Sequence, residues 1–262
     1  MAWSERQRAM LRAMGLSVWA PPAEAPSTPS PAEPEAVAPP RAAPIEAPPA
    51  AARPQRAPIE PQAEPVGVVR SAVDAMDWPA LRSAVIACRA CALCEGRTQT
   101  VFGVGHQRAH WMIIGEAPGE QEDLKGEPFV GAAGQLLDAM LRALGLARSE
   151  GPPERQVFIA NTLKCRPPRN RNPEPAELAQ CEPFLRRQIA LVQPRVILAM
   201  GRFAVQSLLR SDDAIGRLRG RVHAYEGVPL VVTYHPAYLL RQPSDKAKAW
   251  EDLCLAASLL ER

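Results

Sequence analysis

Short, uninterrupted apolar runs alternate along the chain with stretches whose apolar residues recur at helical spacing. The runs predict buried strands at residues 111–114, 157–160, 196–200 and 228–233. Apolar residues three and four positions apart predict helices at 134–144, 177–192, 203–209 and 246–260. Continuous apolar strands separated by amphipathic helices are typical of a parallel sheet covered on both faces. We therefore predict an α/β fold, a three-layer α/β/α sandwich with a central four-stranded parallel sheet.

The first 65 residues do not follow this pattern. Of the 45 residues from 21 to 65, 15 are proline and 13 are alanine. Proline fixes φ and removes a backbone donor, so we expect an extended, disordered linker here. Residues 1–20 place methionines and leucines among arginines, which predicts one short amphipathic helix. The predicted organisation is this helix at 1–20, a disordered Pro/Ala-rich linker at 21–65 and one domain at 66–262.

Cysteines provide the first candidate chemistry, and four of them stand out: Cys88, Cys91, Cys165 and Cys181. A helix over residues 70–94, broken or kinked near Trp78 and Pro79, is predicted to carry the first two at its end. Residues 1–20 lack the apolar core of a secretory signal, so we expect a cytoplasmic protein with reduced thiols. A Cys-x-x-Cys pair with two later cysteines is typical of a metal or iron–sulfur site, and zinc and iron both remain possible.

Two further cysteines are interpreted differently. Cys94 extends the run that begins at Cys88 and leaves the choice of ligands ambiguous. Cys254 lies in an apolar C-terminal segment and is interpreted as a small buried packing residue.

The loops that follow the predicted strands hold the remaining unusual residues. Ligands of parallel α/β sheets bind beyond the carboxyl ends of the strands. An acidic loop follows the first strand, an amide and a basic loop follow the second, and an imidazole follows the fourth. Net charge from residue 66 onward is +4, from 25 Lys+Arg minus 21 Asp+Glu. The basic residues cluster in a way that suits phosphate binding, at Lys164, Arg166, Arg169 and Arg171.

Three motifs, taken together with the cysteines, resemble the family 4 uracil-DNA glycosylases, which are iron–sulfur enzymes of base-excision repair. The motifs are Gly115-Glu116-Ala117-Pro118-Gly119 with Glu122-Asp123, Asn161 with Lys164-Cys165-Arg166-Pro167-Pro168, and His235-Pro236-Ala237. The resemblance covers about residues 80–260. It implies one [4Fe–4S] cluster, held by Cys88, Cys91, Cys165 and Cys181.

The resemblance implies hydrolysis of the N-glycosidic bond between uracil and deoxyribose, after the nucleotide has been flipped out of the stack. His235 would then donate a hydrogen bond to uracil O2, Phe129 would offer a stacking face, and Asn161 would read the base edge. The backbone near Glu116 and Ala117 would contact the base, and either Glu116 or Glu122 would position the water. The expected DNA-binding residues are Arg166, Arg169, Asn170, Arg171, Leu239 and Arg241, with Leu239 as the apolar wedge that fills the vacated space.

A second hypothesis is a non-catalytic iron–sulfur protein that binds DNA or senses redox state. It explains the cysteines and the basic loops, but not the convergence of Glu116, Phe129, Asn161 and His235 at the strand ends. The expected partners are uracil-containing DNA, single- or double-stranded, and a repair or replication protein that docks to residues 1–20. We expect a monomer without membrane contact, because no segment approaches the roughly 18–20 apolar residues of a membrane span.

Overall fold

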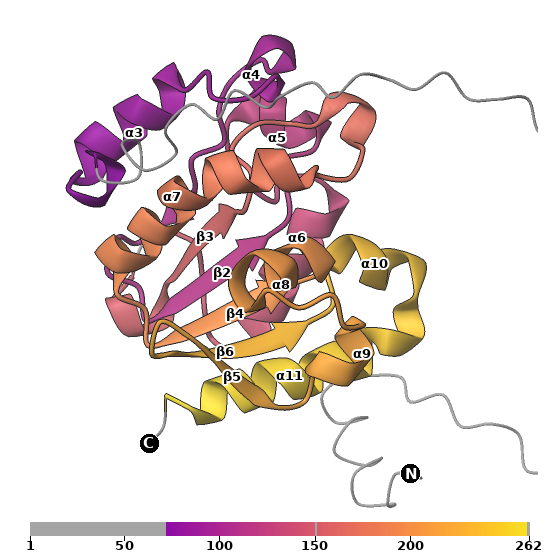
Figure 1. The fold of residues 1–262 in the computed structure, drawn as a ribbon. Coiled ribbons are helices and arrows are strands. Elements are labelled where there is room, and N and C mark those ends of the chain that lie inside the picture. Colours follow the sequence, from indigo (N-terminus) through magenta and orange to yellow (C-terminus); the bar gives the residue numbers. More distant parts are fainter. Residues whose placement is uncertain (1–71, 150, 261–262) are drawn as a thin grey trace, which may run out of the picture. The chain divides into compact units, whose positions relative to one another are not determined.

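The computed structural model describes residues 72–149 and 151–260, which form a sheet with helices on both faces (Figure 1). The predicted helix at residues 1–20 and the predicted linker at 21–65 lie outside the described residues. Both therefore stay predictions.

The sheet confirms the four predicted parallel strands and adds one antiparallel strand at each edge. Its order is β1-β3-β2-β4-β6-β5, in which β3, β2, β4 and β6 are parallel. The edge strands were not predicted, because β1 has two residues and β5 alternates exposed and half-buried positions without a continuous apolar run. The strands are β1 Val104–Gly105, β2 Trp111–Gly115, β3 Val157–Asn161, β4 Val196–Met200, β5 Val222–Tyr225 and β6 Val228–Thr233.

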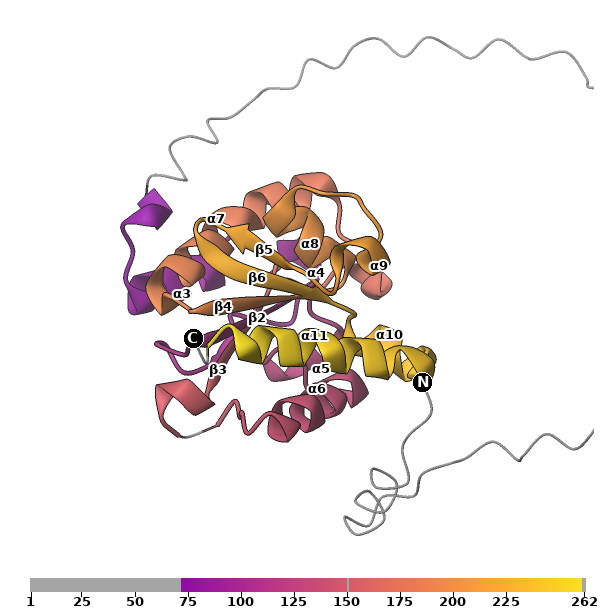
Figure 2. The same ribbon diagram turned by 90° about the horizontal axis from the view of Figure 1, so that it is seen from below.

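Two helical layers cover the sheet, as Figure 2 shows. Successive residues of β2 point to opposite faces, so Met112 and Ile114 pack beneath α3, α7 and α8, while Trp111 and Ile113 pack beneath α6 and α11. The long helices are α3 Trp78–Ala87, α6 Ala132–Ala143, α7 Pro175–Val192, α8 Arg202–Leu209 and α11 Lys246–Ser258. The short ones are α4 Leu93–Gly96, α5 Glu120–Lys125, α9 Ile215–Leu218 and α10 Pro236–Arg241.

The predicted helix over residues 70–94 is broken near Trp78, which confirms one of the two alternatives, but its bounds are wrong: residues 72–74 are helical and α3 is a separate helix. Helix α3 begins at Trp78, where the side chain of Asp77 caps it by accepting from the amide of Ala80 at 3.0 Å. A proline in the first turn initiates a helix rather than kinking it, because its missing N–H has no helical partner there. The helix ends at Ala87 with Cys88 as its C-cap, so Cys91 lies beyond it, in the turn before α4.

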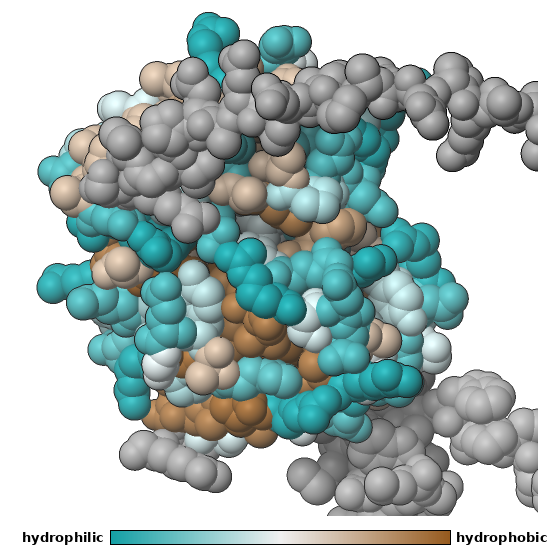
Figure 3. All heavy atoms as spheres, in the orientation of Figure 1, coloured by the Kyte–Doolittle hydropathy of each residue, from teal (hydrophilic) through white to brown (hydrophobic). Residues whose placement is uncertain are grey.

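The outer faces of the helices are mostly polar. In the space-filling view, hydrophilic residues cover much of the face over α7 and α8, and hydrophobic residues show between them (Figure 3). Among the described residues, no helix has the length and apolar character needed to cross a membrane.

Candidate active site

A pocket of about 200 Å³ lies at the carboxyl ends of β2, β3 and β6, where the sheet rule places ligands. It is smaller than the roughly 300–1,000 Å³ typical of drug-sized ligands, which suits a single small ring. All six residues proposed from the sequence for catalysis and base binding line it: Glu116, Ala117, Glu122, Phe129, Asn161 and His235.

Glycines make room for the ring and the amide in this pocket. Gly115 is paired with Asn161 across the sheet, and a Cβ at position 115 would lie 2.5 Å from Oδ1 of Asn161 and 2.6 Å from Cζ of Phe129. The backbone of Phe129 has a φ of 55°, a left-handed conformation that is uncommon for this residue type. Gly134 accommodates it, since a Cβ there would meet the carbonyl oxygen of Phe129 at 1.8 Å. The glycines therefore allow the side chains of Asn161 and Phe129 to lie next to each other in the pocket.

His235 is held in one tautomer as the N-cap of α10. Its Nδ1 accepts from the amide of Ala237 at 3.2 Å, so the proton of the neutral ring lies on Nε2. Burial, with a smaller contribution from the charge of Arg241, lowers the pKa of His235 to about 4, although Glu122 acts in the opposite direction. The ring stacks on Phe129 with centroids 5.2 Å apart and an interplanar angle of 25°. His235 is thus a neutral hydrogen-bond donor with a fixed orientation.

The two candidate glutamates have different surroundings. Glu122 accepts from the amides of Gly119 and Val130, each at 3.0 Å, so both of its oxygens brace the loop around α5. Burial raises the pKa of Glu116 to about 7. A carboxyl group in a pocket whose pKa lies near 7 is suited to proton transfer or to the orientation of water. The geometry therefore favours Glu116 for the water and gives Glu122 a supporting role.

The basic loop lies beside the pocket, and its members are not equivalent. Asn170 and Arg171 line the pocket, whereas Arg169 is exposed. Arg171 forms a bidentate pair with Glu177 at 2.6 and 3.0 Å, and Arg166 donates to the side chain of Asn170 at 2.8 Å. The loop is therefore held by internal contacts.

Two residues expected to meet DNA are buried. Leu239 on α10 is 0 % exposed, which does not fit a wedge that must leave the protein, whereas the next residue, Leu240, is 43 % exposed. The sequence shows the two leucines side by side in the loop predicted after the fourth strand, where the structure has the helix α10, and it could not show which of them faces the core. Lys164 was grouped with the basic patch, but it is 1 % exposed and cannot reach a phosphate. Arg241, the remaining expected contact, is exposed.

Lys164 instead connects several elements inside the fold. Its Nζ donates to the backbone carbonyl of Asn161 and to Oε1 of Gln188, each at 2.7 Å. The amide of Gln188 donates in turn to the carbonyl of Phe102 at 2.8 Å. Burial lowers the pKa of Lys164 to about 8, while Cys181 and Cys165 act in the opposite direction. Its position next to Cys165 and three residues after Asn161 was visible in the sequence, but its burial was not.

Five cysteines surround one small cavity between α3, α4 and α7: Cys88, Cys91, Cys94, Cys165 and Cys181. Arg97 also lines this cavity, and its Nη1 donates to Sγ of Cys165 at 3.0 Å. Nη2 of Arg97 donates to the backbone carbonyls of Ile86 and Cys88. Arg97 was not predicted from the sequence, in which the only signal is a basic residue just after the cysteine run. Cys254 is exposed on α11, so its interpretation as a buried packing residue is wrong.

Across residues 72–149 and 151–260, no group of three or more His, Cys, Asp or Glu side chains is arranged to hold a metal ion.

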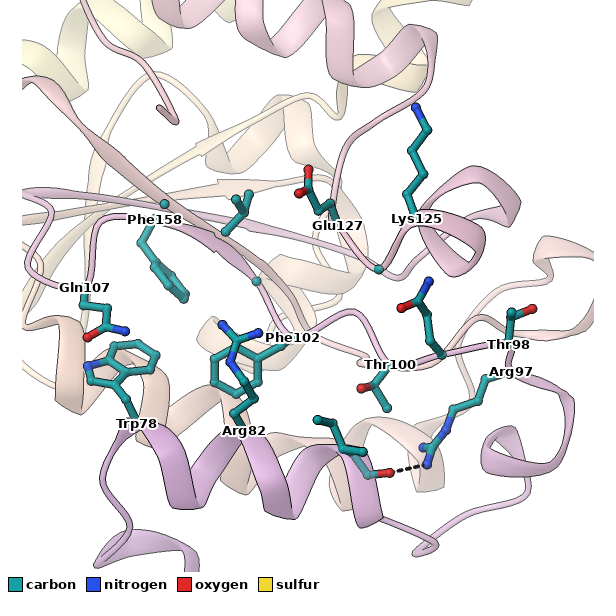
Figure 4. A pocket seen from close by; sticks show the side chains of 16 residues that line it. Trp78, Arg82, Arg97, Thr98, Thr100, Phe102, Gln107, Lys125, Glu127 and Phe158 are labelled. Atoms are coloured by element: carbon teal, nitrogen blue, oxygen red, sulfur yellow. Dashed lines mark hydrogen bonds between the residues drawn. The ribbon is translucent and has the colours of Figure 1, made fainter. Parts of the chain in front are cut away.

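A larger groove, of about 780 Å³, lies elsewhere, between α3, the segment leading into β1 and the turn after α5 (Figure 4). Figure 4 shows Arg82 beside Phe102, with its guanidinium carbon 4.6 Å from the ring centroid. None of the predicted site residues lines this groove. Its size alone does not make it the active site, because it lacks the converging imidazole, amide and carboxyl of the smaller pocket.

Comparison with known proteins identifies the family of this chain. The model of the uracil DNA glycosylase superfamily matches residues 102–254. The type-4 uracil-DNA glycosylase of Archaeoglobus fulgidus is 44% identical over 167 residues, which cover 61% of this chain and 81% of that protein. The enzyme of the same type from Thermotoga maritima is 39% identical over 179 residues, covering 67% and 90%. With the motifs and the pocket described above, these similarities show that the chain belongs to the type-4 group of the uracil-DNA glycosylase superfamily.

Proposed function

We propose that this protein removes uracil from DNA by hydrolysing the bond between the base and deoxyribose, leaving an abasic site. The observation that carries the proposal is the fixed, neutral His235 in one pocket with Asn161 and Phe129. As the bond breaks, negative charge develops on the uracil ring. A preorganised donor at O2 stabilises that charge in the transition state, which is where stabilisation raises the rate.

The other pocket residues have separate tasks. The target nucleotide must leave the stack, because its reacting atoms are inaccessible inside a duplex. The ring of Phe129 supports the flipped base, and the amide of Asn161 pairs with its O4 and N3 edge. The amino group of cytosine would meet the amide N–H of Asn161, donor against donor, so cytosine is disfavoured. Glu116 orients the attacking water, since the methyl group of Ala117 cannot.

DNA binding rests on the exposed cations around the pocket mouth. Arg169 and Arg241 are exposed and can reach phosphates. Arg166 and Arg171 lie in the same basic loop as Arg169, and their contacts with Asn170 and Glu177 hold this loop in place. Phosphate contacts of this kind position DNA without reading its sequence. We propose that the enzyme acts as a monomer on chromosomal DNA in the cytoplasm.

The cysteine cavity supports a [4Fe–4S] cluster as the resident cofactor. Sulfur is the only ligand type among its potential metal-binding side chains, and such donors select iron–sulfur clusters or zinc. Of these two, we propose the cluster, as the resemblance to the family 4 uracil-DNA glycosylases implies. The cluster would be held by Cys88, Cys91, Cys165 and Cys181, with Cys94 beside it. When bound, it would cross-link α3, the loop after β3 and α7.

Loss of one cysteine tests this assignment. We expect Cys165→Ser to lose iron, the visible absorbance of the cluster and DNA binding together, because Cys165 joins the basic loop to the core. The measurements are iron and sulfide content, absorbance and a DNA-binding titration, with the exposed Cys254→Ser as the matched control. A soluble Cys165→Ser protein that keeps full iron content would contradict the ligand set.

The activity is tested with an oligonucleotide that carries one uracil, followed by alkaline cleavage at abasic sites. We expect His235→Ala to lower the single-turnover rate about 10²–10³-fold, as for the loss of one oxyanion donor, with little change in DNA affinity. Strand cleavage by the unaltered protein supports the glycosylase. DNA binding without any cleavage over a range of salt concentrations would favour the non-catalytic iron–sulfur protein instead.

A further inference from the structure

Lys164 is a buried cation that the proposed reaction does not use. It is 1 % exposed, and by volume it ranks first among the fully buried side chains of the described residues. Its ammonium donates to two neutral oxygens, the carbonyl of Asn161 and Oε1 of Gln188. Within the described part of the chain, no carboxylate forms an ion pair with it. A buried charge without a counter-charge is strongly unfavourable, so a nearby negative group would stabilise it.

The cysteines are the groups that can supply this negative charge. Lys164 lines the same cavity as Cys165 and Cys181, and its own backbone amide hydrogen-bonds to the sulfur of Cys181. Thiols become thiolates when they bind a metal or a cluster. The lysine therefore borders the cavity in which negative sulfur ligands would lie once the site is loaded.

On its other side, Lys164 touches the base-reading residue. Asn161 is the last residue of β3, and its side chain points into the pocket beside Phe129 and Gly115. A hydrogen bond to its carbonyl fixes the backbone from which that side chain projects. Gln188 on α7 fixes the lysine in turn and is itself anchored to the carbonyl of Phe102.

We propose that Lys164 is a positioning residue that ties the orientation of Asn161 to the cysteine site, with its ammonium balancing the charge of the cysteine ligands. The inference rests on the proposed function, because it assigns Asn161 to uracil. It predicts that one side chain affects both the electronic properties of the cluster and the reading of the base. Replacing a residue that only fills space would not selectively change the reduction potential of the cluster or the affinity for uracil.

Lys164→Met tests the proposal, since methionine fills most of the same volume without charge or donors. We expect the affinity for free uracil and the kcat/KM on uracil-containing DNA to fall about 10–100-fold, as for other residues that orient a functional ligand. We also expect the reduction potential of the cluster to become more negative, because removing a nearby positive charge disfavours the added electron. Lys125→Met, an exposed lysine on α5, is the matched control and should change neither property.

A double variant distinguishes positioning from general destabilisation. If Lys164 acts through Asn161, then Asn161→Ala combined with Lys164→Met should bind uracil no more weakly than Asn161→Ala alone. Additive losses would overturn the positioning role. Unchanged uracil affinity in Lys164→Met would overturn it as well, and an unchanged reduction potential would overturn the charge-balancing role.

A second variant covers the case in which Lys164→Met does not fold. Gln188→Leu leaves the ammonium in place but removes one of its two acceptors, so we expect weaker uracil binding with the reduction potential unchanged. Full uracil affinity in Gln188→Leu would then overturn the positioning role, and a shifted potential would overturn the assignment of the charge to Lys164. Activity of the unaltered protein is measured first, so that a failure of the proposed function is recognised independently.

Discussion

Residues in the pocket are distinguished by their protonation and by what holds them. His235 is kept neutral by burial and is oriented by the amide of Ala237. The pKa of Glu116, in contrast, is raised to about 7 by burial. Glu122 is close by, but both of its oxygens are occupied by backbone amides. The same residue type therefore has two roles, one in the chemistry and one in holding the loop.

The pH dependence of the single-turnover rate follows from the pKa of Glu116. Below about pH 7 its carboxyl is increasingly protonated and cannot accept from water, so the rate should rise as pH increases through 7 and then level off. His235, with a pKa of about 4, stays neutral throughout this range and adds no second transition. Glu116→Gln should be slower and should show no such rise. A transition near 7 that persists in this variant would assign it to another group.

Short elements carry the reacting groups in this fold, and α10 is the clearest case. It has six residues, begins directly after the N-cap His235, and presents Leu239 to the interior and Leu240 to solvent. Anchoring by Leu239 holds the helix and with it the imidazole. The exposed Leu240 is the apolar side chain on this helix that can enter a DNA stack.

Alanine at each of these positions should have a different effect. Leu239→Ala should lower the free energy of unfolding by about 2–5 kcal/mol, because it leaves a cavity in the core. Leu240→Ala should leave stability unchanged and slow cleavage of duplex DNA more than that of single-stranded DNA, since only a duplex leaves a gap to fill. Denaturant unfolding and rates on the two substrates measure this. Equal losses on both substrates for Leu240→Ala would exclude a wedge role.

For the whole molecule, the catalytic and cysteine sites lie within one domain. The residues lining the pocket and the cysteine cavity run from Val85 to Ala237. The sheet, both helical layers and both sites are thus built from residues that follow the proline-rich segment. The tail was predicted to be a tethered docking peptide rather than part of the catalytic fold.

Deletion of residues 1–65 should therefore leave iron content and activity on short oligonucleotides nearly unchanged, while binding to repair or replication proteins falls. The measurements are iron content, oligonucleotide cleavage and recovery of partner proteins by the full-length and shortened chains. Loss of iron or of oligonucleotide cleavage would show instead that the tail belongs to the fold.

The sequence by itself determined the four central strands, their parallel arrangement and the edge at which Glu116, Asn161 and His235 meet. Each of these depends on a local apolar run or on the order of elements, which a single chain displays directly. The choice between a break and a kink before α3 stayed open because Pro79 fits both a kink and a helix start. Only the tertiary structure decided that Leu239 and Lys164 are buried, that Glu122 braces a loop and that Arg97 reaches Cys165. These properties depend on contacts between segments far apart in the chain, and neither local spacing nor residue type fixes them.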